Sequence, residues 1–370
     1  MKKLYFCIMT NEMYTEQAVQ LLSKLIATPS VSRDESAAAD IMAATLNEWH
    51  KPVHRCANNI WSEAWPIDTA KPTLLLNAHI DTVRPVASWT RSPFEPAIED
   101  GRLYGLGSND CGGGLVSLLF TFSRLSHTTQ PYNLLFLASA EEEVSGENGI
   151  RRVLSELPAV DLALVGEPTG MQPAVAERGL MVLDITAHGR SGHAARCEGV
   201  NAIYEAMDDL RWLHDYRFER ESKLLGRTMM NVTMISAGTQ HNVVPDKCSM
   251  VVDVRTNECY TNTEVLQFIS EHVKSEVVAR STRLQSSHID TDHPLVKRCI
   301  AMGKTPFGSP TLSDQALMPF TSMKMGPGES SRSHTADEYI LISEISDALD
   351  TYYVLLDQLN VVSGPATAQG

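Results

Sequence analysis

The chain has 370 residues, of which 43% are hydrophobic and 21% are charged, which is enough material for one large domain or two. Its formal net charge of -14 argues against a nucleic-acid-binding protein and against binding to anionic membranes, because both need clustered Lys and Arg. Chemistry on small molecules is the function class that these numbers favour.

The seven cysteines are scattered without a C-x-x-C pair, which is typical of reduced thiols in the cytoplasm rather than of a disulfide framework. Residues 1–9 place two lysines ahead of an apolar run of about six residues, shorter than a secretory signal needs. No apolar stretch has the length of a membrane span. We therefore expect a cytoplasmic protein.

Helical periodicity and short apolar runs alternate along the first half of the chain. Apolar positions in helical register predict helices over residues 15–27, 35–49, 115–125 and 147–157. Unbroken apolar runs predict strands that are buried on both faces over residues 73–78, 132–140 and 161–166. Successive units lie about thirty residues apart, the size of a βαβ repeat, so we predict an α/β domain.

The pattern changes near residue 171. Alternating apolar and polar residues predict half-solvated strands over residues 181–187, 230–235 and 249–254, and helical register predicts helices over 200–213 and 264–278. These elements indicate a separate α+β domain with an antiparallel sheet, inserted within the first. The chain then returns to helix and strand signals over residues 294–361, which end in a helix over 342–359.

Polar side chains follow the three buried strands. His79 and Asp81 follow the first strand, the three consecutive glutamates 141–143 follow the second, and Glu167 follows the third. Open α/β sheets place their sites at the carboxyl ends of strands, so we expect these side chains to converge. The adjacent carboxylates repel one another, and a cation must offset their charge unless the loop is solvated.

The glycine-rich stretch of residues 105–114 is superficially similar to a phosphate-binding loop. We expect no strand directly before it, the G-x-x-x-x-G-K-[ST] pattern is absent, and Asp110 stands where a lysine would be needed. We therefore interpret it as a turn that presents Asp110 close to the backbone rather than as a nucleotide site.

Two imidazoles and three carboxylates form a candidate metal site. They belong to His79, Asp110, Glu143, Glu167 and His334. This mixed set suits Zn²⁺, Co²⁺ or Mn²⁺, and a shared Asp can bridge two ions at about 3.5–4 Å. A His at a strand end is more often a satisfied polar residue than a ligand, so the residue types alone leave both interpretations open.

Five motifs in the chain resemble those of the M20 family of metallopeptidases and deacylases. They are His79-Ile80-Asp81-Thr82-Val83, Gly107-Ser108-Asn109-Asp110 with Gly113-Gly114, Ser139-Ala140-Glu141-Glu142-Glu143, Gly166-Glu167-Pro168-Thr169, and Ser333-His334-Thr335-Ala336-Asp337-Glu338-Tyr339. Their order and spacing fit the family along nearly the whole chain. The resemblance implies an α/β fold with a zinc-peptidase-like mixed sheet sandwiched by helices. Residues 1–172 and 289–370 would form the catalytic domain, and residues 173–288 an inserted α+β dimerisation (lid) domain.

The resemblance also implies a cofactor of two divalent metal ions, Zn or Co. His79 and Glu167 would hold one ion, Glu143 and His334 would hold the other, and Asp110 would bridge them.

Two acids beside the ligands are implied to be catalytic. Asp81 would accept a hydrogen bond from the imidazole of His79 and so orient it. Glu142 would be the general base that takes a proton from the attacking water and later gives it to the leaving amine. Glu141 aligns with a family Asp, and we interpret it as a solvated bystander whose replacement by Ala is mild. Cys111 and Gly112 replace a common Met-Lys pair without touching a ligand.

In the inserted domain, His193 resembles the residue that reaches the partner subunit's site in a homodimer and stabilises the tetrahedral oxyanion. Asn242 and Arg255 resemble the positions that hold the substrate carboxylate. A loop His, a turn Asn and a paired strand Arg are all common, so the residues alone do not favour these roles.

Glu rather than Asp at position 167 resembles the deacylases and carboxypeptidases of the family. Residues 325–328 and 337–339 look most like the acetylornithine deacetylase branch. We therefore predict a homodimeric enzyme that hydrolyses the amide bond of an N-acyl amino acid, namely N-acetylornithine in arginine biosynthesis. The alternatives are an N-succinyl-ornithine, N-succinyl-citrulline or N-acetylcitrulline deacylase, a dipeptidase or carboxypeptidase, and a metal-binding protein without turnover. The presence of Glu142 argues against the last of these.

Overall fold

The computed structural model describes residues 10–362, so the N-terminal segment discussed above lies outside the described residues. The described chain divides into two compact units. Unit 1 holds residues 10–175, 289–307 and 313–362, and unit 2 holds residues 176–288 and 308–312. The segment 308–312, which the sequence assigned to the catalytic domain, groups with unit 2, where the Ser309 carbonyl accepts the Arg178 N–H at 3.3 Å.

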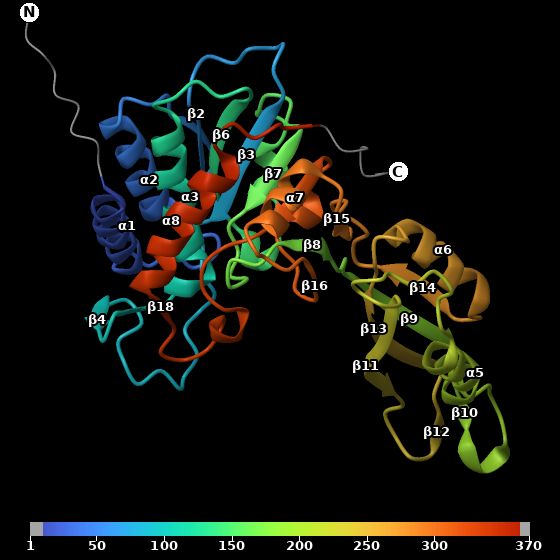
Figure 1. The fold of residues 1–370 in the computed structure, drawn as a ribbon. Coiled ribbons are helices and arrows are strands. Elements are labelled where there is room, and N and C mark those ends of the chain that lie inside the picture. The colour runs from blue at the N-terminus through green and yellow to red at the C-terminus, as the bar shows by residue number, and fades with distance from the viewer. Residues whose placement is uncertain (1–9, 363–370) are drawn as a thin grey trace, which may run out of the picture. The chain divides into compact units, whose positions relative to one another are not determined.

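A nine-stranded mixed sheet runs through unit 1 (Figure 1). In order across the sheet, its strands are β1 (His54–Cys56), β2 (Asn59–Glu63), β6 (Asn133–Ser139), β3 (Thr73–His79), β7 (Leu162–Val165), β17 (Thr321–Lys324), β8 (Ala174–Glu177) and β15 (Ser287–His288), with β16 (Phe307–Ser309) also paired to β8. Strands β6, β3, β7 and β17 run parallel, and β1, β2, β8 and β15 pair antiparallel to their neighbours. The predicted mixed α/β fold is confirmed.

Helices cover both faces of this sheet. Four of them, α1 (Asn11–Ile26), α2 (Ser36–Glu48), α3 (Gly113–Leu125) and α8 (Ile342–Leu356), gather on one face in Figure 1. Helix α7 (Pro294–Ala301) shares their core and packs against α8, while α4 (Ile150–Val153) belongs to a second core. Along β3, Leu74 and Leu76 join the core beneath the first four helices, while Leu75 joins a second core with α4 residues. Burial on both faces therefore explains the unbroken apolar run.

A three-stranded antiparallel sheet, β18 (Tyr339–Leu341), β5 (Arg102–Tyr104) and β4 (Ala97–Glu99), also belongs to unit 1. Strand β5 ends directly before Gly105, so the expectation that no strand precedes the glycine-rich stretch was wrong. Three residues are too few to show a period of two in the sequence.

In unit 2 a four-stranded antiparallel sheet has the order β11 (Met229–Ala237), β13 (Lys247–Arg255), β9 (Met181–His188) and β14 (Glu276–Ala279). Helices α5 (Ala202–Asp215) and α6 (Asn262–His272) pack against it, and β10 (Gly192–His193) pairs with β12 (Val243–Val244). In residues 10–362, no helix is long and apolar enough to cross a membrane.

Two predicted helices are shorter than expected. The helix predicted over 264–278 ends at His272, because Val273 is extended and the β-branched Val277 and Val278 instead pair with β9. The helix predicted over 147–157 is reduced to α4, because the turn before it folds around a buried carboxylate described below.

Candidate metal centre

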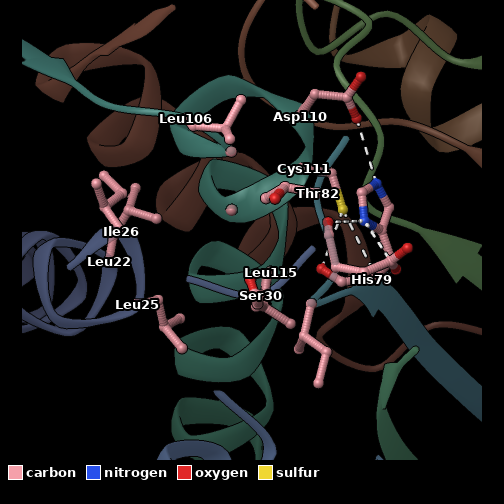
Figure 2. Close-up of a pocket in the computed structure, with 14 residues that line it drawn as sticks. Leu22, Leu25, Ile26, Ser30, His79, Thr82, Leu106, Asp110, Cys111 and Leu115 are labelled. Carbon is pink, nitrogen blue, oxygen red and sulfur yellow. Dashed lines mark hydrogen bonds and ion pairs between the residues drawn. The ribbon is translucent and has the colours of Figure 1, made fainter. Parts of the chain in front are cut away.

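His79 stands at the carboxyl end of β3, with only 2% of its surface exposed. Its Nδ1 lies 2.8 Å from the main-chain oxygen of Asp81, so Nε2 faces a group of acids. Nε2 lies 3.2 Å from Asp110 Oδ1 and 3.6 Å from Glu167 Oε1. Figure 2 shows the imidazole turned toward Asp110, with the Cys111 thiol beside it.

The Asp81 carboxylate holds the glutamate loop rather than the imidazole. It lies 3.6 Å from His79 Nδ1, whereas it accepts the main-chain N–H groups of Glu142 at 3.0 Å and Glu143 at 3.2 Å. The Ser32 hydroxyl also donates to it at 2.7 Å. Asp81 therefore orients His79 through its carbonyl and fixes the backbone of the two glutamates through its side chain.

Asp110 lies between two imidazoles and turns one oxygen to each. Its Oδ2 is 3.5 Å from His334 Nε2, while Oδ1 is the atom that faces His79. The same His334 nitrogen is 3.1 Å from Glu143 Oε1 and 3.0 Å from Oε2. The other four predicted ligands therefore surround the Asp110 carboxylate, in the pairs that the sequence resemblance implied.

Glycines permit this convergence. A Cβ on Gly114 would lie 1.6 Å from the carbonyl oxygen of Gly166, so only glycine lets the start of α3 approach the end of β7 this closely. The loop that carries Asp110 and the strand end that carries Glu167 are brought together by this contact.

The pKa values in the site show how strongly these groups bind protons without a metal. Burial lowers the pKa of His79, but the adjacent Cys111 thiol and the hydrogen bond to Asp110 together raise it well above its usual value. The hydrogen bond to Glu143 raises the pKa of His334 to about 9. Burial, with the charge of Asp110, raises the pKa of Glu167 to about 8.

Low solvation behind the site is one cause of these shifts. A cavity of about 20 Å³, with room for about one water molecule, lies against His79 and Asp110, and its apolar wall includes Leu22, Ile26 and Leu115 (Figure 2). Burial raises the pKa of Glu142 well above its usual value, and the nearby carboxylate of Glu167 adds to this increase.

The donor set fits divalent metal ions. The buried Glu167 Oε1 has no hydrogen-bond partner, although an unsatisfied buried carboxylate oxygen is costly. Donor atoms of His79, Asp110 and Glu143 lie within 4.8 Å of one another, as do those of His79, Cys111 and Glu167. A cation would pair these acids and displace the protons on the imidazoles, since a ligating imidazole must be neutral.

Sequence reasoning missed two buried charged residues beside the site. Lys324, at the end of β17, lowers the pKa of Glu167 although burial outweighs this effect. Asp314 accepts the Ser139 hydroxyl at 2.5 Å, and its burial raises its pKa to about 6. A lysine between two methionines was the available signal for Lys324, whereas Asp314 stands among polar residues and gives no such signal. The partner in each case lies far away in the sequence.

Glu141 is not the solvated bystander that the sequence analysis expected. Only 5% of its surface is exposed, its backbone is left-handed with φ of 54°, and its carboxylate accepts the Asn148 N–H at 3.2 Å and Nδ2 at 3.0 Å. Its own N–H donates to the fully buried Glu35 at 3.3 Å. The predicted mild effect of Glu141→Ala was therefore wrong in its premise, because the carboxylate organises the turn before α4.

We now expect Glu141→Ala to lower the free energy of unfolding by about 1.5–3 kcal/mol, because the hydrogen bonds from Asn148 to a buried charged carboxylate are lost. Urea unfolding of the purified variant measures this change, and Glu147→Ala is the matched control because Glu147 is exposed in the same loop. Equal stability of the two variants would contradict the structural role of Glu141.

In unit 2, the structure brings His193 and Asn242 together. The β10 and β12 pair aligns His193 with Val243, and the Ala194 N–H donates to the Asn242 carbonyl at 3.1 Å. Both residues are exposed.

Arg255 lies apart from this pair. It ends β13, whereas β10 and β12 lie beyond the opposite end of that sheet in Figure 1, and a nine-residue strand spans about 25 Å. Its guanidinium donates to the Asp253 carboxylate at 2.8 and 3.1 Å. The structure therefore does not bring Asn242 and Arg255 to one place within a single chain.

Comparisons with known proteins agree with this architecture. A tripeptidase from Staphylococcus aureus has a TM-score of 0.71 at 20% identity, covering 93% of this chain and 98% of that one. The aminopeptidase PepT from Bacillus cereus has a TM-score of 0.72 at 18% identity, with coverage of 93% and 98%. The YXEP protein of Bacillus subtilis, a dinuclear metal binding peptidase from the M20 family, has a TM-score of 0.70 at 17% identity, with coverage of 95% and 100%. At these identities the likeness shows the fold. The model of peptidase family M20/M25/M40 matches residues 75–358, well over half of the chain, and the protein therefore belongs to that family of hydrolases.

Proposed function

We propose that this chain is a metal-dependent amidohydrolase that removes the acyl group from an N-acyl amino acid, with N-acetylornithine as the first substrate to test. The observation that carries the proposal is the position of Asp110 between two imidazoles, each with a carboxylate of its own. His79 and Glu167 would hold one divalent ion, Glu143 and His334 the other, and Asp110 both. Zn²⁺ and Co²⁺ both suit this set of nitrogen and oxygen donors.

Such ions supply Lewis acidity that polarises an amide carbonyl and acidifies water. Glu142 is the residue that moves the proton. Its Oε2 lies 4.0 Å from His79 Nε2, at the edge of the ligand group, and its backbone is fixed by Asp81. From this position the carboxylate can accept a proton from the attacking water and hold it until the amine nitrogen leaves.

Two observations bear on the substrate class. Glu at position 167 resembles the deacylases and carboxypeptidases of the family. The sequence around residues 325–328 and 337–339 resembles the acetylornithine deacetylase branch, which supports a role in arginine biosynthesis. The proteins similar in fold include a tripeptidase and an aminopeptidase, which supports a peptidase as the second candidate.

A substrate panel tests the proposal. Acetyl- and succinyl-ornithine, acetyl- and succinyl-citrulline, and a set of di- and tripeptides are incubated with the purified protein and added Zn²⁺ or Co²⁺. We expect the highest kcat/KM on acetylornithine. Preference for a peptide would favour the second candidate function, a peptidase. If no compound is hydrolysed, the proposal that the protein is an enzyme would be wrong.

We propose further that the enzyme works as a homodimer through unit 2. Three side chains of α5, Ile203, Tyr204 and Met207, are exposed, and the sheet edge at β11 exposes Met234 and Ile235. An unpaired edge strand with apolar side chains is suited to pairing with a second copy.

The distance of Arg255 from His193 and Asn242 also supports a dimer, because it bears on how one active site could use all three residues. One amino-acid-sized substrate cannot touch both ends of β13, so a site that uses all three residues needs two chains. His193 would then stabilise the oxyanion in the site of the partner, as the M20 resemblance implies.

Subunit mixing is expected to restore activity. His193→Ala and Glu142→Gln are each inactive alone in this account, but a mixed dimer contains one site with both native residues. After exchange of subunits we expect about a quarter of the wild-type rate, because half of the dimers are mixed and half of their sites are intact. No recovery, in a mixture shown by mass to contain mixed dimers, would contradict a shared site.

A further inference from the structure

Glu338 lies directly behind the metal-binding loop. With 2% of its surface exposed, its carboxylate accepts three main-chain N–H groups, from Gly107 at 3.2 Å, Asn109 at 2.8 Å and Asp110 at 3.0 Å. Gly107 takes a left-handed φ of 75°, so the chain turns around this carboxylate. The buried Glu338 side chain thus holds the backbone of the loop that carries Asp110.

Asn109 ties the same loop to the segment that carries His334. Its Oδ1 accepts the Glu329 N–H at 3.0 Å, and its Nδ2 donates to the Glu329 carbonyl at 3.1 Å and to Ser333 Oγ at 3.4 Å. A Cβ on Gly328 would lie 2.3 Å from Asn109 Oδ1, so glycine is needed for this approach. Glu338 and Asn109 together join the Asp110 loop to the His334 loop at both ends.

The negative charge of Glu338 also affects the metal site electrostatically. A second buried carboxylate beside Asp110 is unfavourable when both are charged, unless a cation lies nearby. The same charge strengthens the attraction of the site for a divalent ion. A glutamine at this position would fill the same space, but its amide group would place an N–H donor against the main-chain N–H donors of the loop.

We propose that Glu338 is a positioning residue that sets the bridging carboxylate of Asp110 between His79 and His334 and so sets the affinity of the centre for metal. This inference rests on the proposed metal centre and deepens it. Groups that orient ligands typically contribute about 10–100-fold in metal affinity or activity. Glu338→Gln should therefore weaken metal binding by a factor in that range.

The experiment measures metal affinity rather than turnover. Metal-free wild type, Glu338→Gln and Glu338→Asp are titrated with Zn²⁺ against a chromophoric chelator, and bound metal is counted by elemental analysis. Glu338→Asp retains the charge but shortens the reach, so it should weaken binding less than Gln does. It also serves as the deciding variant should Glu338→Gln not fold.

Asp209→Asn is the matched control. Asp209 is 3% exposed and accepts the N–H groups of Lys274 at 3.0 Å and Ser275 at 2.9 Å, but it belongs to unit 2. We expect this variant to lose thermal stability while its metal affinity stays within twofold of wild type. An unchanged affinity in the folded Glu338 variants, or an equal loss in Asp209→Asn, would overturn the role of Glu338. Absence of metal binding by wild type would instead overturn the proposed metal centre.

Discussion

Glu142→Gln is expected to lower kcat by about 10²–10⁴-fold, the range that a general base typically contributes. The amide keeps the shape of the side chain but cannot take a proton from water or return one to the amine. Glu142 lies beside the ligands without being one of the five, so metal content and KM should change little. Steady-state kinetics on the best substrate of the panel, with metal counted in the same samples, measure the effect.

Glu141→Gln is the internal control for this result. Glu141 is buried against Asn148, with its N–H bonded to Glu35, so its replacement should cost stability while kcat of the folded protein stays within a few-fold of wild type. Comparable losses of kcat at Glu141 and Glu142 would show that the general base has been assigned to the wrong residue. Full activity of Glu142→Gln would contradict the proposed proton transfer.

Removal of metal by a chelator is expected to abolish hydrolysis and to make stability strongly dependent on pH. In the metal-free protein the pKa of His334 is raised from 6.5 to about 9, and that of Glu167 from 4.5 to about 8. The folded state therefore holds both protons more tightly than the unfolded chain. Their contribution to stability is complete below the unfolded pKa values and is lost as pH rises through the folded ones.

The melting temperature of the metal-free protein should accordingly fall between about pH 4.5 and 9. A bound ion takes the place of these protons, so added Zn²⁺ should raise the melting temperature most at the alkaline end. Calorimetry at several pH values, with and without metal, checks this expectation. A melting temperature that rises with pH in the metal-free protein would contradict the assigned protonation states.

The sequence predicted the convergence at the centre because that convergence follows from strand direction. His79 and Glu167 follow strands that are buried on both faces, and parallel neighbours place such residues at one edge. The structure pairs β3 with both β6 and β7 in this sense, so the side chains meet as expected. His334 has no such strand before it, and only the motif around it indicated its place.

The residues that the sequence analysis misjudged or left without a role depend on contacts that lie outside a single helix or strand. Glu141 is buried because Asn148 and Glu35 enclose it, and Glu338 matters because its carboxylate returns to a loop more than two hundred residues earlier. Periodicity describes neighbours along one element and carries no information on such contacts. The distance between Arg255 and Asn242 likewise follows from the direction of β13. The resemblance of each residue to a substrate-binding position gave no information on that direction.

The central claim is that two metal ions held around Asp110 make this chain an amidohydrolase. Metal-free protein is titrated with Zn²⁺ while bound metal and hydrolysis of acetylornithine are followed in the same samples, with the rest of the panel assayed at saturation. The account predicts no activity without metal and activity that saturates at two ions per chain. Full activity in the metal-free protein, or two bound ions with no turnover of any acylated amino acid or peptide, would contradict it.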